Sequence, residues 1–181
     1  MDIQLLYWIN SHHCALLDCI LWGVSAATDL YLLWGLLGIF IWLVDKKRGK
    51  RFAFCIFLAL ALTFISVDLV IKPIVARPRP FAALPGIRQI EVSATGRMVD
   101  SPCAFPSGHC ASSMAAAWLI GIFYRRFRLP LFVLVGLVAY SRVYLGMHYP
   151  SDCVVGLAVG LLCALLAGRA CGVPDHVPDR G

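Results

Sequence analysis

Long apolar runs set the first limit on how this chain can fold. A helix that crosses a bilayer needs roughly 17–25 mostly apolar residues. Five segments meet that requirement, at 28–45, 52–72, 107–124, 129–147 and 151–170. Only 14% of the 181 residues are charged, against about 25% in an ordinary soluble domain. We therefore predict an all-α polytopic membrane helical bundle with five spans, formed as a single domain over residues 1–181.

The segment before the first span has two interpretations. Residues 2–27 are apolar enough for a helix, but the apolar piece at 14–27 is short and carries Asp18. We interpret 2–27 as a helical segment that lies at the membrane interface. In the alternative, residues 13–27 cross the bilayer and the bundle has six spans.

The basic residues predict which way the bundle faces. The link 45–51 holds five Lys and Arg residues and the stretch 124–128 holds three, and alternating spans put both on one side. Because short cytoplasmic loops carry the excess of Lys and Arg, this side is expected to face the cytoplasm. The long loop 73–106 then lies on the non-cytoplasmic side. No basic stripe with interleaved aromatic residues is present, so nucleic acid is not an expected partner.

Three polar segments interrupt the apolar pattern, and the predicted topology places all of them on the non-cytoplasmic side. They are 72–80 (KPIVARPRP), 104–112 (AFPSGHCAS) and 141–152 (SRVYLGMHYPSD). Burying Lys or Arg at the centre of a bilayer costs on the order of 2.5–3.5 kcal/mol on insertion scales, so such residues usually face a protein interior or a cavity. We expect the three segments to meet in one site.

The residue types in these segments predict that the site binds an anion. Lys72, Arg79 and Arg142 would supply positive charge, and the planar guanidinium group suits phosphate oxygens. Ser107 is a good N-cap for the third span, which would leave free backbone N–H groups and the positive end of the helix dipole at the site. Gly108 would let an anion approach the backbone closely. The expected ligand is a phosphate group.

Two histidines would add reactive groups to this site. His109 and His148 can exchange protons near neutral pH, and an imidazole can also be a covalent nucleophile. Asp152 lies in the first turn of the fifth span, where it would fix the tautomer of His148 and leave the other nitrogen free to attack. The sequence has no DxD or HExxH motif, so we expect neither a metal ion nor another cofactor.

The spacing of Arg142 and His148 predicts a break between the fourth and fifth spans. Six residues turn a straight helix by about 600°, so these two side chains could not share a face of one helix. We expect the helix to end near Gly146 and the next helix to start at Pro150.

The same residues match a known signature. Lys72 with Arg79 and Pro80 fits K-x6-R-P, Pro106 to His109 is P-S-G-H, and Ser141 and Arg142 with His148 and Asp152 fit S-R-x5-H-x3-D. On these motifs the chain resembles the type 2 phosphatidic acid phosphatase superfamily, whose pocket the vanadium haloperoxidases share.

The resemblance implies a membrane enzyme that hydrolyses a lipid phosphate or pyrophosphate through a phosphohistidine, without a metal. His148 would be the nucleophile, Asp152 its orienting partner, and His109 the general acid and then the base. The residues that would hold the phosphoryl oxygens, or a vanadate in their place, are Lys72, Arg79, Ser107, Gly108 and Arg142. Small bacterial members act on undecaprenyl pyrophosphate, phosphatidylglycerophosphate, phosphatidic acid or lipid A phosphates. This implies a bacterial inner membrane, with the site facing the periplasm or the exterior.

Other interpretations of these residues stay open. A lipid phosphotransferase could use the same phosphohistidine, and a non-enzymatic membrane protein could retain the pocket. Arg77 is interpreted as a solvated loop charge and Asp68 as the i, i+4 ion-pair partner of Lys72. The pattern indicates neither a particular oligomer nor whether Cys103 and Cys110 form a disulfide.

Overall fold

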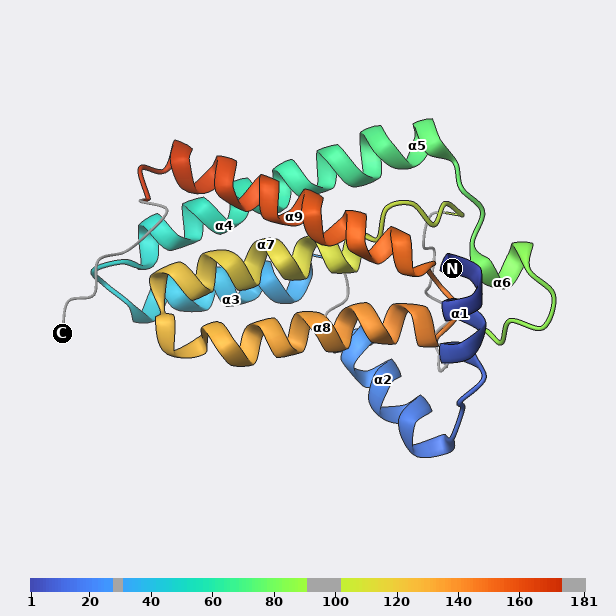
Figure 1. The fold of residues 1–181 in the computed structure, drawn as a ribbon. Coiled ribbons are helices and arrows are strands. Elements are labelled where there is room, and N and C mark those ends of the chain that lie inside the picture. The colour runs from blue at the N-terminus through green and yellow to red at the C-terminus, as the bar shows by residue number, and fades with distance from the viewer. Residues whose placement is uncertain (28–30, 91–101, 174–181) are drawn as a thin grey trace.

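The computed structural model describes residues 1–27, 31–90 and 102–173, and these ranges contain helices and a single isolated bridge between Pro78 and Cys103 (Figure 1). The helices are α1 (Asp2–Asn10), α2 (Ala15–Ala27), α3 (Leu32–Val44), α4 (Gly49–Phe64), the π-helical η1 (Ile65–Ile71), α5 (Lys72–Val75), α6 (Pro80–Ala83), α7 (Gly108–Phe123), the 3-10 helix η2 (Arg125–Phe127), α8 (Arg128–Tyr144) and α9 (Pro150–Ala170). The prediction of an all-helical protein is confirmed for this part of the chain.

Three of the helical segments are long and apolar enough to cross a membrane. They are Gly49–Val75, in which α4, η1 and α5 are continuous, Arg125–Tyr144, and Pro150–Ala170. The pair α2 and α3, bent by 57°, would add a fourth span if it counts as one, and α7 is a shorter apolar helix. The count of five spans and its alternative of six therefore stay predictions.

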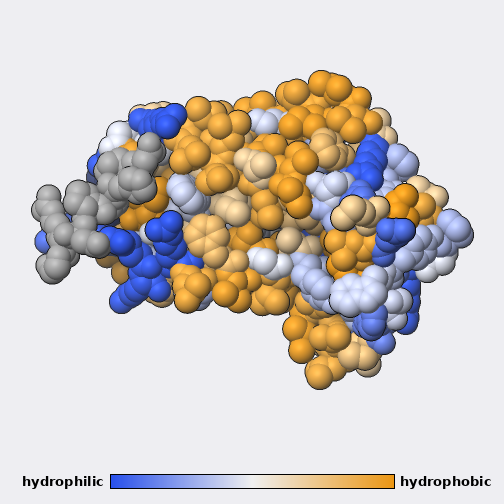
Figure 2. Space-filling view, in the orientation of Figure 1, coloured by the Kyte–Doolittle hydropathy of each residue, from blue (hydrophilic) through white to orange (hydrophobic). Residues whose placement is uncertain are grey.

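The ends of the helices alternate between two ends of the bundle as the sequence predicts. The α3–α4 link, the α7–α8 link and the end of α9 lie together, whereas α5, α6, the start of α7 and the α8–α9 link lie at the other end (Figure 1). Between the two ends the surface is mainly apolar (Figure 2). Exposed large side chains such as Phe40, Phe54 and Leu129 contribute to the apolar exposure. Apolar surface of this extent suits contact with lipid.

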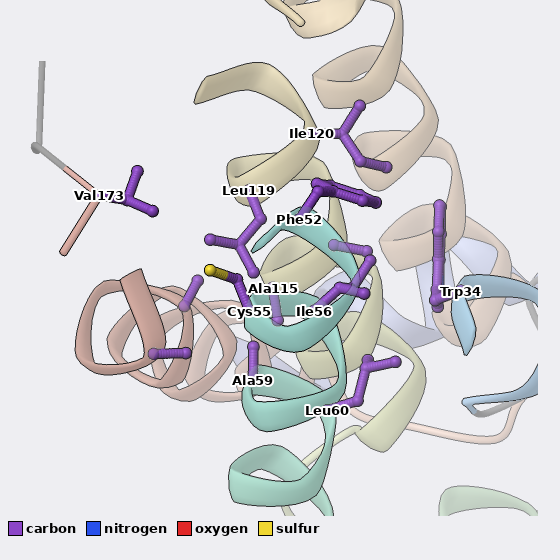
Figure 3. Close-up of a cluster of buried hydrophobic side chains, with 13 residues drawn as sticks. Trp34, Phe52, Cys55, Ile56, Ala59, Leu60, Ala115, Leu119, Ile120 and Val173 are labelled. Carbon is purple, nitrogen blue, oxygen red and sulfur yellow. The ribbon is translucent and has the colours of Figure 1, made fainter. Parts of the chain in front are cut away.

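A core of small and aromatic side chains packs α4 against α7 and α9. Phe52 and Ile56 of α4 lie beside Leu119 of α7, and Trp34 of α3 closes one side (Figure 3). Ala59 and Ala115, which are also fully buried, let the backbones of α4 and α7 come close. Helices in a bilayer associate mainly through such close packing, because lipid tails are as apolar as the side chains.

Two glycines bring α9 into direct contact with the backbone of α7. A Cβ atom on Gly156 would lie 2.5 Å from the carbonyl oxygen of Ser107, and one on Gly160 would collide with the carbonyl oxygen of Ala111. The spacing of the two is the small-xxx-small pattern of closely packed membrane helices. These glycines therefore set how near α9 lies to the start of α7.

The predicted break between α8 and α9 is confirmed. The α8 helix ends at Tyr144, and Gly146 has a φ of 71°, in the left-handed region that glycine adopts without strain. Pro150 is the first residue of α9. A Cβ on Gly146 would also lie 2.8 Å from the carbonyl oxygen of Arg88, so a side chain does not fit there.

The N-terminal segment 2–27 is helical, as predicted, but it is divided into two helices that pack on the bundle. Leu6 and Ile9 of α1 and Leu21 of α2 are buried in a second apolar cluster around the α8–α9 link. Asn10 donates from Nδ2 to the carbonyl oxygen of Tyr144 at 2.8 Å. The segment thus covers one end of the bundle, besides any contact that it makes with the membrane interface.

We expect Gly160→Ala to destabilise the protein by about 1–3 kcal/mol, because the new methyl group would force α9 away from α7. The matched control is Gly136→Ala in α8, where a Cβ would meet nothing within 4 Å. Thermal denaturation in detergent measures both. Equal midpoints for the two variants would contradict the close contact of α7 and α9.

Candidate active site

All of the residues that the sequence predicts for the site lie at one end of the bundle and are buried. They are Lys72, Arg79, Ser107, Gly108, His109, Arg142, His148 and Asp152. Lys72 is the first residue of α5, one turn before the end of the continuous α4–η1–α5 helix, Ser107 to His109 begin α7, and Arg142 lies in the last turn of α8. His148 lies in the α8–α9 link and Asp152 in the first turn of α9. Their functional roles stay predictions.

A carbonyl group holds the imidazole of His148. Nδ1 of His148 lies 2.7 Å from the carbonyl oxygen of Ala104, and both residues are buried. A carbonyl oxygen can only accept, so Nδ1 must carry the hydrogen. In a neutral imidazole the lone pair then lies on Nε2. The tautomer suits attack by Nε2.

Asp152 lies behind this contact. Its Oδ2 is 3.8 Å from Nδ1 of His148, and it accepts a hydrogen bond from the backbone N of Tyr149 at 2.9 Å. Its Oδ1 accepts from Nη1 of Arg77 at 2.6 Å. We expected Asp152 to bind the imidazole directly, whereas here Ala104 makes the hydrogen bond. The carboxylate is still near enough to favour positive charge on the ring.

Positive groups surround His148. Burial lowers the pKa of His148 well below its ordinary value of 6.5, and nearby positive groups lower it further. In order of effect these groups are Arg142, Arg79, His109 and Lys72. These groups come from four elements: Arg142 lies in α8, Arg79 is the N-cap of α6, His109 lies in α7 and Lys72 in α5. A lowered pKa favours the neutral imidazole, which a nucleophile requires.

The ammonium group of Lys72 is held by Asp68, as the sequence predicts. The two groups are 2.6 Å apart, and Tyr31 donates its hydroxyl to the other carboxylate oxygen of Asp68 at 2.7 Å. Nζ of Lys72 would lie 3.7 Å from a Cβ on Gly108. Because Gly108 has no side chain, the amine and the start of α7 can both reach an anion between them.

The two arginines each donate to an uncharged group. Nη1 of Arg79 donates to the carbonyl oxygen of Met147 at 3.3 Å, and Nη1 of Arg142 donates to the hydroxyl of Ser25 at 2.6 Å. A carbonyl oxygen and a hydroxyl group are neutral acceptors, so these two hydrogen bonds do not themselves offset the positive charge.

The start of α7 has the geometry of an anion site. Ser107 is the N-cap, and its hydroxyl accepts from the backbone N of Cys110 at 3.5 Å. The backbone N of Ser107 donates to the carbonyl oxygen of Asp152 at 3.0 Å, which joins α7 to α9. A helix N-terminus beside several cations attracts an oxyanion.

The interpretation of Arg77 as a solvated charge is wrong. Besides Asp152, it binds the hydroxyl of Ser151 at 2.9 Å and Asp2 at 3.0 Å, and its guanidinium lies 3.6 Å from the ring centroid of Tyr149. The sequence offered one signal: Pro78 and Pro80, on either side of Arg79, restrict the backbone directly after Arg77. Ala104 gave no signal, because its contribution is a backbone oxygen.

The cysteines and the candidate metal ligands add no further site. Cys103 and Cys110, like the other six cysteines, are free thiols. Within the described ranges, no group of three or more His, Cys, Asp or Glu side chains is arranged to hold a metal ion.

A family model and several known proteins are similar to this chain in sequence. The family model described as the PAP2 superfamily matches residues 31–171. The lipid A 4'-phosphatase of Bacteroides thetaiotaomicron is 30% identical over 166 residues, which cover 88% of this chain and 72% of the relative. The undecaprenyl-diphosphatase BcrC of Bacillus subtilis is 26% identical over 162 residues, covering 88% of this chain and 77% of that protein. A decaprenylphosphoryl-5-phosphoribose phosphatase of Mycobacterium tuberculosis is 42% identical over 98 residues, but the match covers 52% of this chain and 48% of the relative.

Two solved structures share the fold. The crystal structure of LpxE from Aquifex aeolicus superposes with a TM-score of 0.74 at 24% identity, over 93% of this chain and 94% of that chain. A phosphatidylglycerolphosphate phosphatase from Bacillus subtilis superposes with a TM-score of 0.65 at 20% identity, over 93% and 83% of the two chains.

We expect His148 of the free protein to titrate below pH 6.5, because its burial and the surrounding cations disfavour imidazolium. The unfolded chain would then bind a proton more readily than the folded one, so His148 reduces stability as the pH falls through this range. NMR of protein labelled with 15N-histidine in detergent micelles measures the pKa, and His148→Gln assigns the signal. A pKa at or above 6.5 would contradict the buried, cation-lined environment.

Proposed function

The chain belongs to the PAP2 superfamily, and from this membership we propose that it hydrolyses the phosphate or pyrophosphate group of a membrane lipid through a phosphohistidine at His148. The observation that carries the proposal is that His148 is buried at the same end of the bundle as the buried Lys72, Arg79, Arg142 and His109, with Nδ1 already held by a carbonyl group. A scaffold or a transporter has no need of a neutral imidazole in that setting.

In the first step Nε2 of His148 attacks phosphorus. A P–N bond forms as the P–O bond to the leaving group breaks, and protonated His109 gives its proton to the leaving oxygen. The ring of His148 is positively charged while the P–N bond exists. The Ala104 carbonyl accepts its N–H, and the Asp152 carboxylate, 3.8 Å away, offsets the charge.

In the second step a water molecule replaces the histidine. Neutral His109 takes a proton from the water as its oxygen attacks phosphorus, and the P–N bond breaks with its electron pair returning to His148. The products are inorganic phosphate and protonated His109, which is ready for the next cycle.

The cations and the α7 N-terminus would stabilise the transition state. Negative charge spreads over the equatorial oxygens of a transferring phosphoryl group, so catalysis depends mainly on positioned positive groups. Arg79 and Arg142 offer planar donors, and Lys72 offers a point charge. Ser107 would donate its hydroxyl and Gly108 its backbone N–H. The role of each residue is part of the proposal.

The substrate that we propose is a class of lipid. The relatives named above are a lipid A phosphatase, a prenyl diphosphatase and a phosphatase of a prenyl-linked sugar phosphate. Each name describes a phosphate on a membrane lipid, and the site recognises that shared group. Undecaprenyl pyrophosphate, phosphatidylglycerophosphate, phosphatidic acid and lipid A phosphates are therefore the panel to test.

We further propose that the site faces away from the cytoplasm. The basic links 45–51 and 124–128 lie at the end of the bundle opposite the site (Figure 1). Cytoplasmic loops carry the excess of Lys and Arg. For a bacterial protein, the proposal is therefore an inner-membrane location with the site at the periplasmic or exterior surface.

We expect His148→Ala to lower phosphate release on the order of 1,000-fold or more, because the nucleophile is lost. His109→Ala should be impaired most with leaving groups of high pKa, which need the proton. The assay is release of phosphate from the lipid panel in detergent. His12→Ala, a change at an exposed histidine of the same chain, is the control and should be unaffected. Normal turnover by His148→Ala would rule out the covalent step, and turnover that needs an added acceptor lipid would indicate a phosphotransferase.

We also expect activity to persist in EDTA and vanadate to compete with the substrate. The cations of the protein would supply the charge that a metal supplies elsewhere, and vanadate resembles the transferring phosphoryl group. Steady-state kinetics in the same micelles measure both effects. A strict requirement for a divalent ion would contradict the mechanism.

A further inference from the structure

Arg77 contacts both of the groups that hold His148. Its Nη1 donates to Asp152 at 2.6 Å, and its carbonyl oxygen accepts from the backbone N of Ala104 at 2.7 Å. Ala104 in turn accepts from Nδ1 of His148. The guanidinium also covers the ring of Tyr149, the residue after His148. The position of the imidazole therefore depends on where Arg77 is held.

The α1 helix reaches Arg77 through Asp2. Oδ2 of Asp2 accepts from Nη2 of Arg77 at 3.0 Å and from the hydroxyl of Ser151 at 2.7 Å, while Oδ1 accepts from the backbone N of Ser151 at 2.9 Å. Partial burial raises the pKa of Asp2, but the hydrogen bonds from Ser151 and Arg77 outweigh it and lower the pKa below its ordinary value. Asp2 is thus a carboxylate that joins α1 to Arg77 and to the start of α9.

The α2 helix reaches the other side of the site through Ser25. The hydroxyl of Ser25 accepts from Nη1 of Arg142 at 2.6 Å, and both side chains are buried. The carbonyl oxygen of Arg142 also accepts from the backbone N of Met147 and of His148, at 3.1 and 3.2 Å. Arg142 therefore joins α2, the α8–α9 link and the proposed phosphate position.

Apolar packing supports these polar contacts. Leu6, Ile9 and Leu21 of the two N-terminal helices share one buried cluster with Leu145 and Met147 of the α8–α9 link. Asn10 adds hydrogen bonds to the carbonyl oxygens of Tyr144 and Arg88. The link that carries His148 is thus covered by α1 and α2.

The α1 and α2 residues that make these contacts lie before the part of the chain that the family model matches, which begins at residue 31. Catalysis by oriented groups is sensitive to position, and a misplacement of about 1 Å can cost about 100-fold in rate. Because α1 and α2 hold Arg77 and Arg142, these two helices can change the rate without touching the substrate.

We propose that α1 and α2 are a working part of the active site, in which Asp2 and Ser25 are positioning residues for Arg77 and Arg142. This inference rests on the proposed function. Asp2 acts through Arg77 on the nucleophile, whereas Ser25 acts through Arg142 on the phosphate. The two residues should therefore affect different kinetic constants.

The test compares Asp2→Asn with Ser25→Ala in detergent, using the lipid phosphate that the wild-type protein hydrolyses. We expect Asp2→Asn to lower kcat about threefold to fivefold with little change in KM, because a partly exposed ion pair makes only a modest contribution. We expect Ser25→Ala to raise KM and the vanadate inhibition constant about tenfold, because a buried hydrogen bond to a charged group is lost. Asp2→Glu should restore part of kcat.

Matched controls are Gln4→Ala in α1 and Cys19→Ala in α2, which change exposed side chains on the same helices. Both should keep wild-type kinetics. Thermal denaturation in the same detergent should give midpoints for all variants within a few degrees of the wild type. If Ser25→Ala does not fold, Ser25→Cys keeps the size of the side chain while weakening the hydrogen bond.

A second measurement asks whether Asp2 acts through Arg77. In an Arg77→Gln background, Asp2→Asn should lower kcat by clearly less than it does alone. The inference would be overturned if the kcat losses of Asp2→Asn and Arg77→Gln multiplied in the double variant, or if Asp2→Asn and Ser25→Ala kept wild-type kinetics. It would also be overturned if kcat and KM changed equally in both variants and the change followed a lower denaturation midpoint. A wild-type protein that releases no phosphate from any lipid would instead overturn the proposed function.

Discussion

Positive charge buried in an apolar bundle is the constraint on which this structure depends. Lys72, Arg79 and Arg142 are each at most 5% exposed, and an unpaired buried charge costs several kcal/mol. Each therefore has a polar partner: Asp68 for Lys72, the Met147 carbonyl for Arg79 and the Ser25 hydroxyl for Arg142. Two of these partners are uncharged. The cations gathered at this end of the bundle suit the anionic ligand proposed above.

The packing of α7 and α9 and the geometry of the site depend on the same small residues. Gly156 allows the carbonyl oxygen of Ser107 to lie against α9, and the backbone N of Ser107 binds the carbonyl oxygen of Asp152. The N-terminus of α7 is thereby held next to the first turn of α9. A helix dipole acts over about one turn, so this close approach decides whether it can act at His148 at all.

Much of the fold and most of the candidate site could be predicted because the signals are local. Apolar runs predicted the helices, and Gly146 with Pro150 predicted the break that separates Arg142 from His148. The pairing of Lys72 with Asp68 follows from helical spacing. Arg77 was misjudged, because its partners Asp2 and Asp152 lie 75 residues away in each direction along the chain. No local pattern shows such contacts.

The sequence by itself determined which residue types stand at the ends of which helices, and the alternation of helices was enough to bring three polar segments together. It therefore indicated a phosphate site and its two histidines. Only the tertiary structure decided how the nucleophile is held, because the hydrogen bond to His148 comes from the backbone of Ala104, an oxygen that every residue possesses. It also decided that α1 and α2 contact the elements that carry these residues, through Asp2 and Ser25. Hydrogen bonds such as those of Asp2 and Ser25 depend on a few tenths of an ångström, and helix packing rather than residue type sets that distance.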